Sequence, residues 1–166
     1  MTQQKSVQIA IILSALLLIL SSVLHVTAYF VPVPTKWITP LFICIFPLAI
    51  FVAINIKQKP LKDPLDIFKK PIDPVFILTI LIFIYAWFSG IINMTTLSNG
   101  SGTIQNGQYF LECKGVLIKE ISYPEYCHLI MADARLYTGH TMAFASVILA
   151  LLREQARKVK KDASTV

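Results

Sequence analysis

Charged residues are scarce in this sequence, and three long apolar stretches contain none. Only 14% of the residues are Asp, Glu, Lys or Arg, whereas 55% are hydrophobic, and the mean hydropathy is +0.66. The three stretches are residues 7–31, 37–56 and 75–97. A chain of 166 residues cannot bury three such helices on all sides of a soluble core. The scarcity of charge therefore predicts membrane-spanning helices, each long enough to cross ~30 Å of hydrocarbon.

Motifs that carry known chemistries are also missing. The sequence has no glycine-rich phosphate loop, no Ser nucleophile elbow, no carboxylate pair and no Cys-x-x-Cys. Its His residues never occur as His-x-x-His or His-x-x-x-His, so we expect no metal site. We predict no catalytic residue and no cofactor. These absences favour a protein that is not an enzyme.

The last apolar stretch, residues 129–152, is different because it contains Asp133, Arg135 and His140. A charge in hydrocarbon costs several kcal/mol unless it is paired or hydrated, so this stretch is the best candidate for a functional site. At ~1.5 Å per residue, His140 lies about 20 Å above Arg153, and Arg135 about 27 Å above it. We expect Asp133 and Arg135 to lie near the membrane boundary, and His140 to form the floor of a pocket or docking surface.

Polar residues of other helices fall at the same depth. The predicted binding residues of this outer-leaflet cluster are His25, Asn93, Asp133, Arg135, Tyr137, Thr138 and His140. Two simpler explanations stay open. Asp133 and Arg135 can reach water or pair with the neighbouring loop, and His140 can bond to a backbone carbonyl or a tyrosine.

The basic residues are distributed unevenly between the connections. Eleven of the fifteen fall on one predicted side: Lys5, five in the 57–73 loop and five from Arg153 onward. The other four are Lys36, Lys114, Lys119 and Arg135. By the positive-inside rule, both termini and the 57–73 loop are cytoplasmic. This asymmetry accounts for the net charge of +6, so we predict no nucleic-acid partner.

Proline residues mark the connections. Pro32 and Pro34 predict a tight turn between the first two helices, and Pro47 predicts a kink in the second helix. The 57–73 loop is rich in Pro, Lys and Asp, which is typical of a solvated basic loop. A loop that lies on the lipid headgroups is the alternative.

Residues 98–122 form the one connection large enough for a structured soluble element. Residues 98–102 are typical of a flexible exit from the third helix. Two short strands are predicted over residues 108–113 and 116–121, joined by a hairpin turn at Lys114-Gly115. Ser122 and Glu125 match a capping box, so we expect a helix that continues into the fourth span.

Cys113 and Cys127 both fall on the oxidising side of the membrane. They are the candidate disulfide, which would contribute ~3 kcal/mol by closing its loop in the unfolded chain. Two free thiols are the alternative.

Several of these segments together resemble a known family. They are residues 107–122, Glu125-Tyr126 and Arg135-Leu-Tyr-Thr-Gly-His140-Thr-Met142-Ala-Phe144. The pattern is similar to a family of small bacterial four-helix inner-membrane proteins with a periplasmic hairpin and an Arg-x-x-(Ser/Thr)-Gly-His-x-Met segment. This chain has Thr141 where that family often has an aromatic residue. The resemblance implies the topology and marks Arg135, Thr138, Gly139 and His140, but it implies no activity.

The sequence therefore predicts an all-α membrane protein that forms a single domain over residues 1–166. Its four transmembrane helices are expected at about 7–31, 37–56, 75–97 and 123–157, with a cytoplasmic loop at 57–73 and a periplasmic loop with a β-hairpin at 98–122. Both termini are cytoplasmic, and the location is the bacterial inner membrane.

Two classes of function stay open. The first is a binding protein that recognises a protein partner at its periplasmic face, such as an immunity protein or an accessory subunit of a membrane complex. The second is a membrane enzyme or transporter component that uses His140 with Asp133 or Arg135 for proton transfer or lipid-headgroup binding. The lack of any repeat symmetry argues against transport by a single chain, although a homo-oligomer could form a path. We favour the first class, and we expect the protein to contact the lipid bilayer as well as its protein partner.

Overall fold

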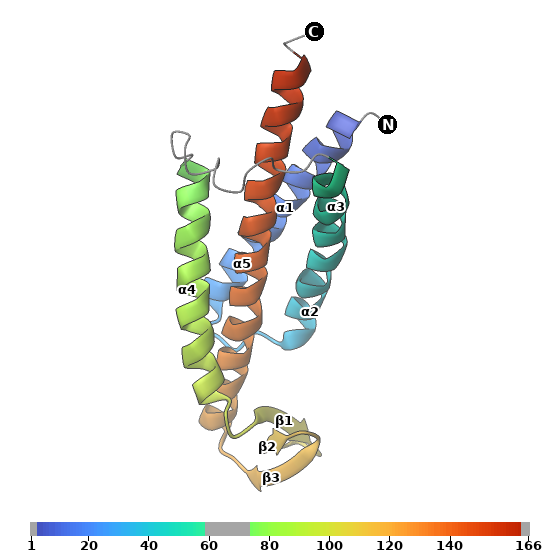
Figure 1. The fold of residues 1–166 in the computed structure, drawn as a ribbon. Coiled ribbons are helices and arrows are strands. Elements are labelled where there is room, and N and C mark those ends of the chain that lie inside the picture. The colour runs from blue at the N-terminus through green and yellow to red at the C-terminus, as the bar shows by residue number, and fades with distance from the viewer. Residues whose placement is uncertain (1–2, 59–73, 164–166) are drawn as a thin grey trace.

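The computed structural model is a bundle of helices with a small sheet at one end (Figure 1). It describes residues 3–58 and 74–163. The elements are α1 (Gln3–Thr27), α2 (Thr35–Ile43), α3 (Ile45–Gln58), α4 (Pro74–Thr96), β1 (Ser101–Gln105), β2 (Gln108–Cys113), β3 (Val116–Glu120) and α5 (Tyr123–Ala163). The helix α5 lies at the centre and contacts each of the others. Figure 1 shows that α1 begins and α5 ends at the end opposite the sheet. We call these two ends the terminal end and the sheet end.

Within the described residues, four segments are long and apolar enough to cross a membrane. They are Lys5–Thr27, Thr35–Ile54, Pro74–Thr96 and Tyr123–Arg157, the second of which combines α2 with α3. The predicted four-helix architecture is thus confirmed, with boundaries shifted by a few residues. Most of the predicted 57–73 loop lies outside the described residues, so its relation to the lipid surface stays a prediction.

The second span is interrupted at Cys44, three residues before Pro47. Pro47 has no N–H to donate to the carbonyl of Ile43, and its ring clashes with that carbonyl. The helix α2 accordingly ends at Ile43, and α3 begins at Ile45. The N–H of Cys44 bonds to the carbonyl of Pro40 at 3.0 Å and closes the last turn of α2. The expected kink is therefore a break one helical turn before the proline.

Small side chains line the contact between α1 and α5. The buried stripe of α1 consists of Val7, Ala10, Ser14, Leu17, Ser21 and His25, and the fully buried residues of α5 include Ala134, Thr138, Thr141 and Ala145. Ser14 and Ser21 each donate to the carbonyl four residues earlier at 2.7 Å, so neither hydroxyl needs a partner on α5. Small residues let two backbones approach closely, which is how helices pack where large apolar side chains gain nothing by burial.

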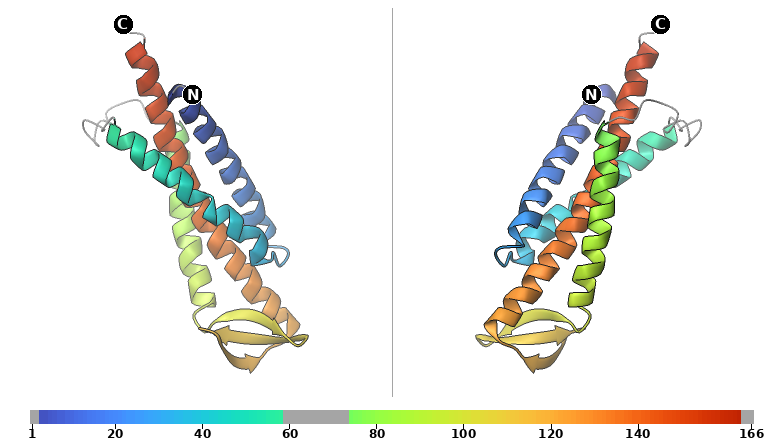
Figure 2. Two further views of the ribbon diagram at one scale, coloured as in Figure 1. Left: turned by 90° about the vertical axis from the view of Figure 1, so that its right-hand side faces the viewer. Right: turned by 90° about the vertical axis from the view of Figure 1, so that its left-hand side faces the viewer.

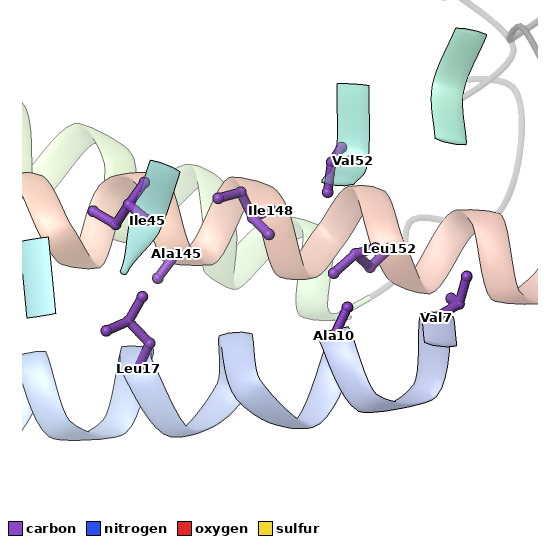
Figure 3. Close-up of a cluster of buried hydrophobic side chains, with 8 residues drawn as sticks. All are labelled: Val7, Ala10, Leu17, Ile45, Val52, Ala145, Ile148 and Leu152. Atoms are coloured by element: carbon purple, nitrogen blue, oxygen red, sulfur yellow. The ribbon is translucent and has the colours of Figure 1, made fainter. Parts of the chain in front are cut away.

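The larger apolar core lies towards the terminal end, between α1, α3 and α5 (Figure 3). Its buried residues are Val7, Ala10, Leu17, Ile45, Val52, Ala145, Ile148 and Leu152. Both α1 and α4 pack directly on α5 (Figure 2). Nearer the sheet end, a smaller apolar cluster of Ala28, Val33, Ile38 and Ala134 lies beside the polar contacts that join α1, α4 and α5.

The sheet has three antiparallel strands in the order β1-β2-β3. Both residues of the Lys114-Gly115 turn have positive φ, at 52° and 82°, as a two-residue type I′ hairpin requires, so the predicted hairpin is confirmed. The flexible exit expected at residues 98–102 is shorter, because β1 begins at Ser101 and runs to Gln105. Asn106-Gly107 makes a second turn of the same type, with φ of 52° and 81°. Asn-Gly is the strongest short hairpin signal, and it went unused in the prediction.

Aromatic rings join the sheet to the first turns of α5. The ring of Tyr109 lies 5.2 Å from that of Tyr123 and 4.9 Å from that of Tyr126, measured between centroids. The predicted capping box is also present. The N–H of Ser122 donates to Oε2 of Glu125 at 2.8 Å, and the N–H of Glu125 donates to Oγ of Ser122 at 3.4 Å. The sheet is therefore held at the start of a helix that runs the whole length of the bundle.

Cys113 and Cys127 are both free cysteines, as is Cys44. The disulfide predicted between Cys113 and Cys127 is thus not formed in this structure. Strand pairing and the tyrosine contacts hold this loop instead.

Candidate functional site

Three helices meet around the guanidinium of Arg135 on α5. Its Nε donates to Oδ1 of Asn93 on α4 at 3.0 Å, and its Nη1 donates to the carbonyl of Ala28, just past the end of α1, at 2.9 Å. The guanidinium carbon also lies 4.9 Å from the centre of the Tyr29 ring, within the range of a cation–π contact. Arg135 is therefore held from three sides at the level where α1 ends.

Every group that holds Arg135 is electrically neutral. Within residues 3–58 and 74–163, no carboxylate lies at ion-pair distance from Arg135, and its Nη2 has no hydrogen-bond partner. Asp133 is half-buried two positions earlier on α5, and it forms no ion pair or hydrogen bond with a described residue. Neither side chain is paired with the sheet. The site thus carries a positive charge that the described part of the chain does not neutralise.

His25 is the most deeply buried ionisable side chain of the site, with 1% of its surface exposed. Its Nδ1 lies 2.9 Å from Oγ1 of Thr138, and its Nε2 lies 2.7 Å from the hydroxyl of Tyr85. That hydroxyl lies 3.1 Å from the hydroxyl of Tyr29. A single chain of polar contacts therefore runs from the Arg135 region to the interior of the bundle.

The partners of Thr138 determine the direction of this chain. The Thr138 hydroxyl donates to the carbonyl of Ala134 at 2.6 Å, so its oxygen accepts from Nδ1–H of His25. In the neutral imidazole, Nε2 then carries no proton and accepts from Tyr85. The Tyr85 oxygen accepts from the hydroxyl of Tyr29. Each hydroxyl proton of the chain is thus assigned to one acceptor.

Asn93 is oriented by a second set of bonds on its own helix. Its Nδ2 donates to the carbonyl of Ser89 at 2.7 Å and lies 3.2 Å from the Ser89 hydroxyl. The amide oxygen consequently points to Arg135, which matches the donor that it meets. Tyr85, Ser89 and Asn93 are spaced four apart and form one stripe of α4.

The structure brings together four of the seven predicted binding residues: His25, Asn93, Arg135 and Thr138. It leaves Asp133, Tyr137 and His140 outside this set, and the last two are exposed. The expectation that His140 forms the floor of a pocket is wrong, because His25 occupies the deep position. Thr138 faces α1, and a residue two positions later points about 200° away around the helix. His140 instead bonds through Nδ1 to the carbonyl of Leu136 at 2.7 Å, as the simpler explanation held.

Sequence reasoning missed two members of the site, Tyr29 and Tyr85. Tyr29 is four residues after His25, and Tyr85 precedes Ser89 and Asn93 in steps of four. Such spacing places each tyrosine on the same helix face as a residue already singled out. A search for polar residues at this spacing would have found both.

The described residues contain no group of three His, Cys, Asp or Glu side chains that could hold a metal ion. The chemistry available at the site is hydrogen bonding and charge, supplied by Arg135, the two tyrosines and His25.

The second notable surface is the edge strand β3. All five of its residues are exposed, and it pairs with β2 alone, so its other edge is unpaired within the described residues. The exposed fractions are 61% for Val116 and 55% for Ile118, large values for β-branched apolar side chains in a strand. An exposed apolar edge strand is a template for association with another chain.

In comparisons with known proteins, no family model, curated protein or solved structure matches this chain. The arguments for function therefore depend on the Arg135 site and on β3.

Proposed function

We propose that the chain is a non-enzymatic membrane protein that binds a protein partner at its sheet end, through the edge strand β3. The observation that carries this proposal is the exposure of every residue of β3, including Val116 and Ile118. Soluble sheets normally protect such an edge with charge, proline or a covering segment. In β3 the charges of Lys119 and Glu120 are confined to its last two residues, and the open apolar part, residues 116–118, is suited to strand addition or apolar docking by a partner.

The position of β3 supports this role. The ring contacts of Tyr109 with Tyr123 and Tyr126 fasten the sheet to α5, so the edge is presented on a rigid support. A preformed binding surface loses little conformational entropy when a partner binds.

The orientation in the membrane is part of the proposal. The excess of Lys and Arg at the terminal end favours a cytoplasmic location for both termini and a periplasmic location for the sheet, in a bacterial inner membrane. The resemblance of residues 107–122 and 135–144 to small inner-membrane proteins supports the same topology. The partner is then a toxin, if the chain is an immunity protein, or a larger membrane complex, if it is an accessory subunit.

A role in proton transfer has less support. The hydrogen-bond chain from Tyr29 ends at the carbonyl of Ala134, which cannot pass a proton on. Farther along α1, Ser21 and Ser14 are bonded to their own helix. Arg135 bonds to Asn93 and the His140 ring lies beside Gly90, both on α4, but no hydrogen bond among the described residues joins the two side chains.

A native gel tests the proposal. The full chain is extracted from its membranes in mild detergent, and we expect it to migrate as a complex larger than its own 18.6 kDa. Ile118→Asp places a charge on the apolar edge and should release the free chain. Lys114→Asp is the control, because it introduces the same carboxylate in the exposed turn outside β3. Unchanged migration of Ile118→Asp beside the wild type would contradict the proposal.

A further inference from the structure

We propose that Arg135, with Tyr29 and Tyr85 beside it, forms a binding site for the phosphate group of an anionic phospholipid at the sheet end of the bundle. This site is separate from β3. It depends on the four helices crossing a bilayer, and it does not depend on the protein partner proposed above.

The first argument is charge. Arg135 is half-buried, its bonds go to a side-chain amide and a backbone carbonyl, and the described residues supply no carboxylate to it. Nη2 has no hydrogen-bond partner among the residues that the structure describes. A guanidinium binds phosphate through just such paired N–H donors, and charge-assisted bonds of this kind are about twice as strong as neutral ones. Neutral partners orient the group while leaving its charge for a ligand.

The second argument is depth. Ala28 follows the last residue of α1, and Asn93 precedes the end of α4 by three residues, or about 4.5 Å along the helix. The guanidinium therefore lies at the level where α1 and α4 end, while α5 continues to Tyr123, and we place the lipid headgroups at this level. Phe30 and Trp37, in and just after the turn that follows α1, are 78% and 65% exposed. Exposed aromatic side chains at this level are typical of a membrane interface.

The third argument is access. Tyr29 at the end of α1 and Tyr85 on α4 are 48% and 44% exposed, although their hydroxyls bond to each other. Tyr29 and Tyr85 meet where α1 and α4 touch each other, and their exposed parts face outward, so a ligand at these tyrosines approaches from the side of the bundle. The side of a membrane-spanning bundle is surrounded by lipid, so the anionic group that lies next to this site is a lipid headgroup.

Polar contacts add a second point of recognition. The Tyr29 hydroxyl lies at the mouth of the hydrogen-bond chain that leads to His25, and it is able to turn from Tyr85 to an anionic oxygen while Tyr85 continues to donate to His25. The Tyr29 ring covers one side of the guanidinium, so a phosphate meets it along its edge. Lys in place of Arg135 would keep the charge and lose this edge geometry.

Lipid titration followed by native mass spectrometry tests the site. The purified full chain is delipidated in detergent and titrated with phosphatidylglycerol, with phosphatidylcholine as the lipid of zero net charge and inorganic phosphate as the soluble ion. We expect the wild type to prefer phosphatidylglycerol, and Arg135→Gln to weaken that binding by about tenfold. Arg153→Gln is the matched control, because it removes an equal charge at the terminal end, and it should change the binding by less than twofold.

Further variants keep each outcome decisive. Should Arg135→Gln fail to fold, Arg135→Lys serves in its place, and it should bind phosphatidylglycerol more weakly than the wild type. Equal losses in the Arg135 and Arg153 variants would reveal unspecific attraction and overturn the proposal, as would unchanged binding in a folded Arg135 variant. Competition by inorganic phosphate at concentrations that saturate the chain without lipid would assign the site to a soluble ion and overturn the lipid assignment. Ile118→Asp should bind lipid as the wild type does, so a failure of the β3 proposal leaves this test unaffected.

Discussion

The Nε of Arg135 on α5 donates to Oδ1 of Asn93 on α4 at 3.0 Å, so an uncharged amide orients a charged side chain where two spans meet. The Asn93 amide is itself oriented, because its Nδ2 donates to the carbonyl of Ser89 at 2.7 Å. The pair connects α4 to α5 without neutralising the charge. Stability and ligand binding should therefore respond differently to changes at Asn93.

Asn93→Ala removes the acceptor of a charged donor and should lower the free energy of unfolding by about 2 kcal/mol. Unfolding in mixed detergent micelles, followed by circular dichroism, measures this change. Asn99→Ala is the control, because Asn99 is exposed in the turn after α4, and it should stay within about 0.5 kcal/mol of the wild type. Equal stability of Asn93→Ala and the wild type would show that the contact contributes nothing.

Asn93→Asp should reduce lipid binding while the stability of the fold is kept. A carboxylate at this position would pair with Arg135 and neutralise it, so phosphatidylglycerol binding should fall about as far as in Arg135→Gln while the fold is kept. Native mass spectrometry of the folded variant gives the answer. Wild-type affinity in Asn93→Asp would mean that the Arg135 charge does not bind the lipid.

The hydrogen-bond directions around His25 predict one tautomer. Nδ1 should carry the proton and Nε2 should be bare, since Thr138 accepts at Nδ1 and Tyr85 donates to Nε2. Nitrogen-15 chemical shifts of the labelled imidazole distinguish the two tautomers directly. A proton on Nε2 in place of Nδ1 would reverse the donor and the acceptor in the bonds between His25 and its two neighbours.

Tyr85→Phe removes the donor to a buried nitrogen and should lower the unfolding free energy by about 1–3 kcal/mol.

Gly102 allows the sheet to approach α5. A Cβ at this position would lie 2.9 Å from Cδ2 of Tyr126, inside the closest contact that real side chains make. Gly102→Ala should therefore displace the sheet, at a cost of about 1–3 kcal/mol, and speed tryptic cleavage at Lys114 and Lys119. Gly107→Asn is a suitable control, since a Cβ there meets nothing within 4 Å and Asn tolerates the positive φ. Similar cleavage rates in all three proteins would contradict the close contact.

The proposed topology has its own test. Single cysteines at Lys114 in the β2–β3 turn and at Arg157 near the end of α5 are compared in a chain whose natural cysteines are replaced by Ser. A membrane-impermeant maleimide added to spheroplasts should label Lys114→Cys and spare Arg157→Cys until the membrane is permeabilised. The reverse labelling would show that the protein has the opposite orientation in the membrane, with the sheet on the cytoplasmic side.

The sequence predicts the four helices and the β2–β3 hairpin because both follow from local patterns. Uncharged runs of 20 residues or more define the first three spans, and the fourth stays apolar on average despite Asp133 and Arg135. A glycine after Lys114 supplies the positive φ of a tight turn. The break at Cys44 follows from the missing N–H of Pro47 in the same way. No partner element is needed to make these features.

The site was harder to predict because it depends on how α5 is rotated against its neighbours. Helical spacing shows that Thr138 and His140 face different ways, but it does not show which of them faces inward. The structure buries the face of α5 that carries Ala134, Thr138 and other small residues, because they allow close helix contact. An inward position was expected for His140 because it is polar, whereas size decided the packing.

Photo-crosslinking from β3 in living cells tests the central claim most directly. A benzophenone amino acid replaces Ile118 on the exposed edge and, in a matched strain, replaces Gln105 at the end of β1. Illumination should join the chain to one discrete partner from position 118, with a much weaker product from position 105, and both variants should reach the membrane in equal amounts. Absence of a product from position 118, or equal products from both positions, would contradict recognition of a partner by β3.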